Sequence, residues 1–172
     1  MSLYTFTVHL DRSPTDDEID RLYDAGLDDC TPVCSPTGHG RLMVAREADS
    51  MTQAILTVVA EISEAGLNAV GIDSDDLVTI TVIGERTNRT RESARLLASS
   101  QRGPGGFPPP VSDGKIPLYS WASVREWFRT HYGDQSVAPA DHDADTLAAA
   151  DLLLRARLLT NDMSELSTLV TA

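Results

Sequence analysis

Five arginines lie within the 22 residues from Glu85 to Gly106, "ERTNRTRESARLLASSQRGPGG", in a chain whose formal net charge is −12. Arginine carries a permanently charged planar guanidinium group that can bond phosphate oxygens or the O6 and N7 atoms of guanine. Because the arginines gather on one short segment, we expect a polyanion such as nucleic acid as its partner. The alternative is a solvated helix surface that happens to be rich in arginine.

Charge is distributed unevenly along the chain. Residues 1–78 carry a formal charge of −11, residues 79–132 carry +4 and residues 133–172 carry −5, which together give the net −12. Such sign asymmetry bears on binding partners rather than on fold. The acidic flanks should repel DNA and confine contact to the basic segment, and the affinity should fall steeply as salt is added.

The arginine segment has the pattern of two short helices joined by a tight turn. Thr79 is predicted to cap a helix over residues 80–86, and Thr90 to cap a second helix. Asn88 lies at the turn position where a left-handed backbone is expected, since asparagine tolerates positive φ. The apolar residues that hold the two helices together are predicted to be Ile80, Ile83, Ala94 and Leu97. The pattern is typical of a helix-turn-helix, whose second helix enters the major groove of DNA, and a structural helical hairpin is the alternative.

A wing is predicted after the second helix. Extended runs over residues 107–111 and 116–119 flank the turn sequence "SDGK", which is typical of a hairpin. Ser120 is then predicted to cap a third helix, with Trp121 packing the wing down. The core face of that helix is predicted to consist of Val124, Trp127 and Phe128.

Taken together, residues 77–133 resemble the winged helix-turn-helix of the excisionase and MerR-like (AlpA-type) DNA-binding superfamily. The segments "ERTNRTRESARLL", "GPGGFPPPV" and "LYSWASVREWF" carry the resemblance in the right order. It implies that the second helix reads the major groove and that the wing contacts the backbone or minor groove. The implied DNA-binding residues on the recognition helix and its entry are Arg89, Thr90, Arg91, Ser93 and Arg95, with Arg102 and Lys115 near phosphate or the minor groove. Asn88 departs from the glycine that is common in such turns.

Residues 1–73 are predicted to form a separate domain. The alternating segment "LYTFTVHL" predicts a strand, and a helix is expected to follow with Ser13 as its cap and Pro14 at its first position. The segments "CTPVCS" and "RLMVARE" predict a hairpin, Ser50 is predicted to cap a second helix, and residues 67–72 a last strand. The order β-α-β-β-α-β is that of a ferredoxin-like domain. Its expected roles are oligomerisation or the binding of a protein partner or small effector.

No constellation of catalytic or metal-binding residues is predicted. Cys30 and Cys34 have no second Cys or His pair at metal spacing nearby, which favours two ordinary thiols over a zinc site. His9, His39 and the acids of "DDEID" show no spacing that gathers them around a nucleophile or a metal. We therefore expect no enzyme activity, no metal and no cofactor.

Residues 141–172 are predicted to form a C-terminal helical segment. A helix is expected from about Ala144, with an i,i+4 pair of Asp151 and Arg155 on the side opposite to an apolar stripe. The predicted stripe consists of Ala149, Leu152, Leu153, Ala156 and Leu159. It is expected either to pack on the protein's own domains or to form a dimer contact. A shorter helix is predicted over residues 163–169, and "DHDAD" is interpreted as an acidic helix start rather than a metal site.

These patterns predict an α+β protein with a ferredoxin-like domain, a winged helix-turn-helix and a C-terminal helical segment. The predicted function is sequence-specific binding of double-stranded DNA by a homodimeric transcriptional regulator. The alternative is a protein-binding module, antitoxin-like or from phage defence, whose acidic N-terminal domain binds a partner. The sequence has no signal-peptide pattern and no apolar run of about 20 residues. The expected location is therefore cytoplasmic, with nucleoid association when the protein is bound to DNA.

Overall fold

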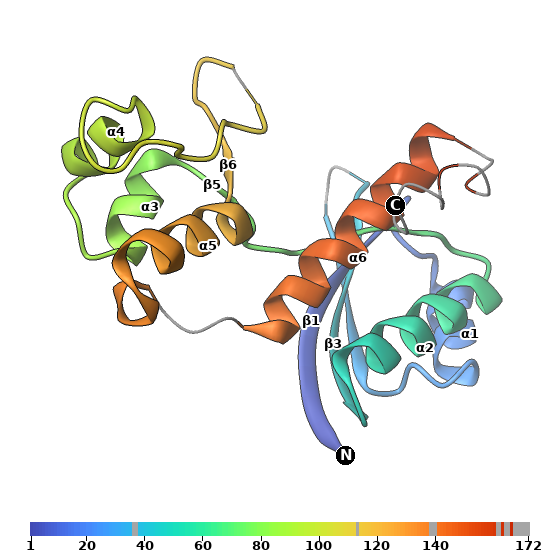
Figure 1. Ribbon diagram of the computed structural model, residues 1–172. Helices are drawn as coiled ribbons and strands as arrows, with labels where there is room; N and C mark the ends of the chain where they lie inside the picture. The colour runs from blue at the N-terminus through green and yellow to red at the C-terminus, as the bar shows by residue number, and fades with distance from the viewer. Residues whose placement is uncertain (36–37, 113, 138–140, 161–162, 164–165, 167–172) are drawn as a thin grey trace. The chain divides into compact units, whose positions relative to one another are not determined.

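The computed structural model describes residues 1–35, 38–112, 114–137, 141–160, 163 and 166. The chain divides into two compact units, residues 1–73 with 146–172 and residues 74–145. We call the first the sheet unit and the second the helical unit (Figure 1). Six α-helices and two antiparallel sheets lie within the described residues, so the predicted α+β class is confirmed.

The sheet unit has its helices and strands in the predicted order. They are β1 (Ser2–Leu10), α1 (Asp16–Asp24), β2 (Cys30–Cys34), β3 (Gly40–Ala48), α2 (Met51–Glu64) and β4 (Ala69–Ile72). The strands form one antiparallel sheet in the order β2-β3-β1-β4, and α1 and α2 lie on the same side of it (Figure 1). Alternate residues Phe6, Val8 and Leu10 of β1 are buried, as the period of two in the sequence predicts. Ser50 caps α2 as predicted, since its Oγ accepts the Gln53 N–H.

The cap of α1 differs from the prediction. Thr15, not Ser13, is the N-cap, because only Thr15 has a glutamate three residues later that can complete a capping box. The Glu18 carboxylate accepts the Thr15 backbone N–H at 3.0 Å and takes two guanidinium bonds from Arg12 at 2.6 and 2.7 Å. Ser13 instead donates its backbone N–H to the Gly38 carbonyl.

We expect this cap to make folding pH-dependent in acid. The bonds from Arg12 and from the Thr15 N–H lower the pKa of Glu18 to about 2. A carboxyl whose pKa falls on folding stabilises the fold fully above its ordinary pKa of about 4.5, and this contribution is lost as the pH falls through the folded value. Thermal melts of the wild type and of Glu18→Gln should therefore converge as the pH falls from about 5 to about 2.

The matched control is Asp20→Asn, which removes an exposed carboxylate of the same helix that has no ion-pair partner among the described residues. It should follow the pH dependence of the wild type. A constant difference between wild type and Glu18→Gln at every pH would contradict the assignment of the ionised carboxylate as the stabilising form.

In helix α6 (His142–Leu159) the predicted apolar stripe is not the face that packs on the sheet unit, whereas the alternative role of the stripe as a dimer contact stays a prediction. Within the sheet unit its inward face consists of Leu147, Ala150, Asp151 and Leu154, whereas Leu152 is 63% exposed and Leu159 is 89% exposed. The predicted Asp151–Arg155 pair exists at 3.0 Å, but Asp151 is buried instead of facing away. Its Oδ1 accepts the Ile72 N–H at 2.9 Å. The Ile72 N–H at the edge of the sheet needs a hydrogen-bond acceptor when it is buried. The face of α6 that carries Asp151 supplies this acceptor and packs against the sheet unit.

The C-terminal helical segment differs from the prediction at its start. Helix α6 begins at His142, two residues before the expected start. The shorter helix predicted over residues 163–169 falls outside the described residues except at Met163 and Leu166. No helix among the described residues is long and apolar enough to cross a membrane.

The helical unit has a separate core. Its elements are β5 (Leu77–Val78), α3 (Ile80–Arg86), α4 (Arg91–Ala98), β6 (Tyr119–Ser120), α5 (Trp121–Tyr132) and the 3-10 turn η1 (Asp134–Ser136). Ser120 caps α5 as predicted, since its Oγ accepts the Ser123 N–H. The predicted residues Val124, Trp127 and Phe128 are buried. The ring of Phe107 packs edge-on against Trp127, with centroids 4.9 Å apart.

The predicted wing forms only in part, since the Val111 N–H donates to the Leu118 carbonyl but no two-stranded sheet continues from this contact among the described residues. The described part of residues 107–119 holds only one isolated bridge, Ser112 with Leu118, because the three prolines at 108–110 have no N–H to donate to a partner strand. Residues Tyr119–Ser120 pair instead with Leu77–Val78, a strand that was not predicted. Asp113 of the predicted turn lies outside the described residues. Phe107, not Trp121, anchors this loop to the core.

The two cysteines lie at the ends of β2 as free thiols, Cys30 buried and Cys34 exposed. Burial and the neighbouring Asp29 raise the pKa of Cys30 to about 11, so at neutral pH it remains a protonated thiol that donates to the Leu27 carbonyl. Among the described residues, no group of three or more His, Cys, Asp or Glu could hold a metal ion.

Candidate nucleic-acid interface

Helices α3 and α4 meet through a turn whose conformation follows from its residues. Thr79 and Thr90 are the N-caps, since their Oγ1 atoms accept the N–H groups of Val82 and Ser93, and Asn88 has a positive φ of 52°. These three local predictions are confirmed. Gly84 lies in α3 where the turn passes closest, and a Cβ there would be 2.9 Å from the Arg89 carbonyl oxygen. Glycine at this position therefore allows the close approach of helix and turn.

Three of the predicted DNA-binding residues come together in a groove. Arg91 and Arg95 of α4 and Lys115 of the following loop line a cavity of about 380 Å³. The other lining residues are Thr79, Ile80, Thr81, Ala98, Ser99, Ile116, Pro117 and Tyr119. This groove, which we call the α4 groove, has three cations and no acid among its lining residues. It is therefore a site where an anion can be bound.

The cations of the α4 groove are not equally free. Arg91 and Lys115 have no ion-pair partner among the described residues. Arg95 donates two guanidinium bonds to Glu92, at 2.9 and 2.7 Å, and these bonds raise the pKa of Arg95 and lower the pKa of Glu92. An approaching phosphate must therefore compete with Glu92 for Arg95, but finds Arg91 and Lys115 available.

The remaining predicted residues lie elsewhere or have local roles. Arg89 does not line the α4 groove, because its guanidinium lies over the ring of Tyr132, 4.7 Å from the centroid, and near Phe128 at 5.5 Å. It borders a different hollow, beside Asn88 and Gln135. Arg102 is exposed in the loop after α4. In the cap of α4, the backbone N–H of Ser93 donates to the hydroxyl oxygen of Thr90.

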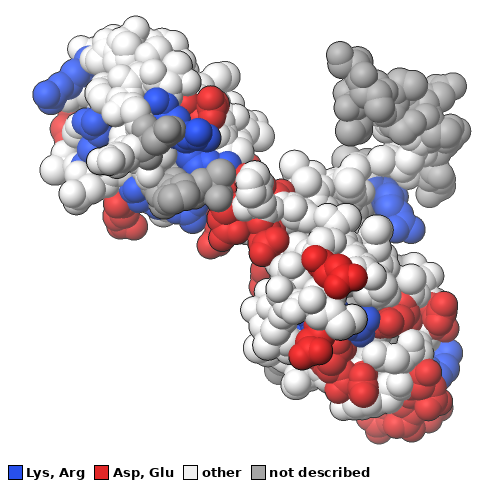
Figure 2. All heavy atoms as spheres, turned by 60° about the horizontal axis from the view of Figure 1, so that its bottom comes forward, with Lys and Arg blue, Asp and Glu red and all other residues white. Residues whose placement is uncertain are grey.

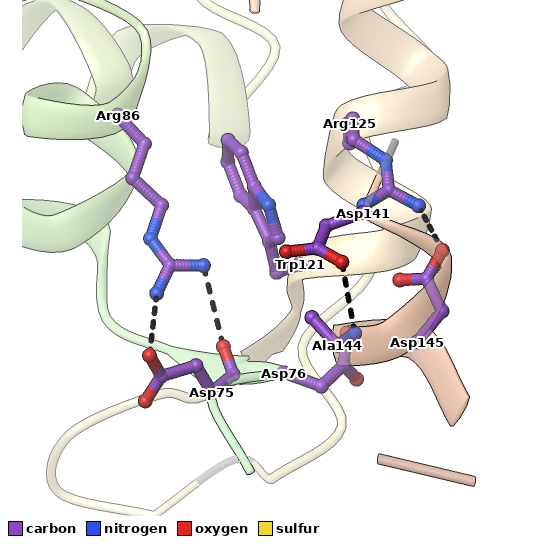
Figure 3. Close-up of a pocket in the computed structure, with 8 residues that line it drawn as sticks. All are labelled: Asp75, Asp76, Arg86, Trp121, Arg125, Asp141, Ala144 and Asp145. Atoms are coloured by element: carbon purple, nitrogen blue, oxygen red, sulfur yellow. Dashed lines mark hydrogen bonds and ion pairs between the residues drawn. The ribbon is translucent and has the colours of Figure 1, made fainter. Parts of the chain in front are cut away.

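Sequence reasoning missed a second hollow of the helical unit, of about 360 Å³ (Figure 3). Its lining residues are Asp75, Asp76, Arg86, Trp121, Arg125, Asp141, Ala144 and Asp145. Asp76 caps α5 by accepting the Ala122 N–H at 2.8 Å, and Arg125 binds Asp145 at 2.7 Å. Arg86 lies 5.0 Å from the Trp121 ring centroid. Because these charges are paired within the unit, the hollow is structural, and no local signal in the sequence links Asp76 to the distant start of α5.

Charge on the surface follows the division into units. Figure 2 shows Lys and Arg side chains gathered on a face of the helical unit and Asp and Glu side chains over much of the sheet unit. Comparison with protein-family models, curated proteins and solved structures gives no match.

Proposed function

We propose that the protein is a sequence-specific double-stranded DNA-binding protein that acts as a transcriptional regulator. The observation that carries this proposal is the α4 groove, in which Arg91, Arg95 and Lys115 come together beside the capped start of α4. Lysine and arginine that neutralise phosphates release counterions, which supplies much of the affinity for DNA. Arginine near the start of a helix can also bond guanine in the major groove.

The proposal also assigns a fold to each of the two units. We infer that residues 77–133 form a winged helix-turn-helix in which α4 is the recognition helix and the loop carrying Lys115 acts as the wing. The hydroxyl caps of α3 and α4 and the left-handed Asn88 between them support this assignment. The strand order β2-β3-β1-β4 with two helices on one side supports a ferredoxin-like plan for the sheet unit.

One observation favours a second candidate function, the binding of a basic protein partner by the sheet unit. Helix α1 exposes four carboxylates, those of Asp16, Asp17, Asp20 and Asp24. Clustered acids can attract a basic partner by electrostatic complementarity. A stoichiometric complex that forms through residues 1–73 and persists without DNA would favour this function.

Selection of bound sequences from random duplex DNA, repeated over a salt series, tests the proposed function. We expect an enriched sequence, and a logarithm of affinity that falls linearly with the logarithm of salt concentration, with a slope of roughly −2 to −3 if two or three groove cations contact phosphate. Poly-glutamate is the matched polyanion control and should compete poorly. Absence of any enriched sequence together with salt-independent binding would overturn the proposal.

A further inference from the structure

Among the described residues of the sheet unit, no helix covers one face of the sheet, which we call the open face. Helices α1 and α2 cover the opposite face (Figure 1), and α6 docks at the β4 edge through the bond between Asp151 and Ile72. The largest apolar side chains on the open face are Leu3, 62% exposed, and Met43, 56% exposed. The strand pairings place the outward residues of β1, β3 and β2 side by side, namely Leu3, Thr5, Thr7, His9, Thr31, Val33, Arg41, Met43, Ala45 and Glu47.

The outward residues of β3 carry opposite charges at the two ends of the strand. In order along the strand they are Arg41, Met43, Ala45 and Glu47, all exposed. A cation therefore stands at one end, a carboxylate at the other, and a large and a small apolar side chain lie between them. Neither Arg41 nor Glu47 has an ion-pair partner among the described residues. When two copies of this strand face each other in opposite directions, the cation of each copy therefore lies opposite the carboxylate of the other.

We propose that the open sheet face binds a second copy of this chain, with β3 of the two copies packed face to face in opposite directions. In a two-fold interface the contact of one residue with another occurs twice. Arg41 then lies against Glu47 of the second copy, and Met43 lies against Ala45 of the second copy. Packing a large side chain against a small one lets the two faces interdigitate.

Charge directs a second copy to this face rather than to the rest of the sheet unit. Residues 1–73 contain 4 Arg and 13 Asp or Glu, so two sheet units repel one another over most of their surfaces. The β3 stripe pairs one cation with one carboxylate and is the neutral part of this surface. A basic partner would be drawn instead to the exposed acids of α1.

The sheet edges are closed to a second copy. Pro32 lies in the middle of the edge strand β2 and has no N–H to offer a neighbouring strand. At the other edge, the Ile72 N–H of β4 is bonded to Asp151. Addition of a strand from another molecule is therefore blocked, which leaves the face as the route to association.

The area of the open face determines how tightly two copies are expected to associate. Three strands about 4.8 Å apart, with about 3.4 Å per residue, present on the order of 400 Å² per copy, less than the about 800 Å² per partner of a standard interface. We therefore expect a dimer that dissociates on dilution.

Sedimentation velocity of the full chain over a roughly hundredfold range of concentration tests the proposal. Arg41→Glu and Glu47→Arg should each weaken dimerisation at least about tenfold, because each places like charges opposite one another. The double variant Arg41→Glu/Glu47→Arg should restore it, since both pairs are re-formed with reversed sign. Arg21→Glu, which changes the net charge as Arg41→Glu does but lies on α1, is the matched control for that variant and should dimerise like the wild type.

Three results would overturn the proposal. The first is a chain that stays monomeric throughout the concentration range. The second is a double variant that does not regain the dimer while thermal melts show it folded. The third is a dimer that survives Met43→Glu but is lost in Leu152→Glu/Leu153→Glu, which would assign the contact to the exposed side of α6.

Discussion

Replacing both Arg91 and Lys115 by alanine should weaken binding to the selected DNA by about 2 to 4 kcal/mol, roughly 30- to 1000-fold. These two cations line the α4 groove and have no ion-pair partner among the described residues, so their charge is available to phosphate or guanine. If both contact phosphate, the slope of log affinity against log salt should also become less steep by about 2. Fluorescence anisotropy with labelled duplex measures both quantities.

The matched control is Arg21→Ala/Arg157→Ala, which removes two cations from the sheet unit and gives the same net charge. Its affinity should change little. Arg95→Ala alone should cost less than Arg91→Ala, because Arg95 is already held by Glu92. An equal loss in the control pair would show that long-range charge, not the α4 groove, governs binding.

Phe128→Ala should destabilise the helical unit by about 3 to 5 kcal/mol, the usual cost of removing a fully buried phenylalanine ring. Phe128 is completely buried and packs against the rings of Trp127 and Tyr132, with centroids 5.1 and 5.7 Å away. It also lies near the Arg89 guanidinium. The loss should remove packing from α5 and from the turn before α4 together.

The chain provides a selective probe for this prediction. Its 2 tryptophans, Trp121 and Trp127, both lie in the helical unit. The urea midpoint measured by tryptophan fluorescence should therefore show the full shift. Circular dichroism should in addition show a second transition, at a higher urea concentration, from the sheet unit. Tyr23→Ala, which removes a half-exposed ring from α1, should leave the fluorescence midpoint in place. Coincident shifts in both probes would mean that the two cores unfold as one.

The features predicted well from sequence are those decided by neighbouring residues. The caps at Thr79, Thr90 and Ser120 and the positive φ of Asn88 depend on side-chain and backbone groups within three or four residues. The alternation in β1 likewise follows directly from its burial on one face. Local chemistry of this kind is visible in a single sequence.

The errors arose where distant residues decide the outcome. The docking face of α6 depends on a bond between Asp151 and Ile72, which are far apart in the chain, and the pairing of Tyr119 depends on Val78. In the candidate site, the sequence pattern grouped Arg89 with Arg91 and Arg95 on the recognition helix and its entry. The structure separates Arg89, stacked on Tyr132, from Arg91 in the groove, because α5 supplies the ring.

The close approach at Gly84 also predicts what relatives of this chain should retain. A side chain there would collide with the backbone of the turn, so this position tolerates little change whatever DNA sequence the protein binds. We expect homologous sequences to keep a glycine here, a hydroxyl residue at the positions of Thr79 and Thr90, and asparagine or glycine at the position of Asn88. That spacing is a signature by which distant members of the lineage can be recognised when overall similarity has been lost.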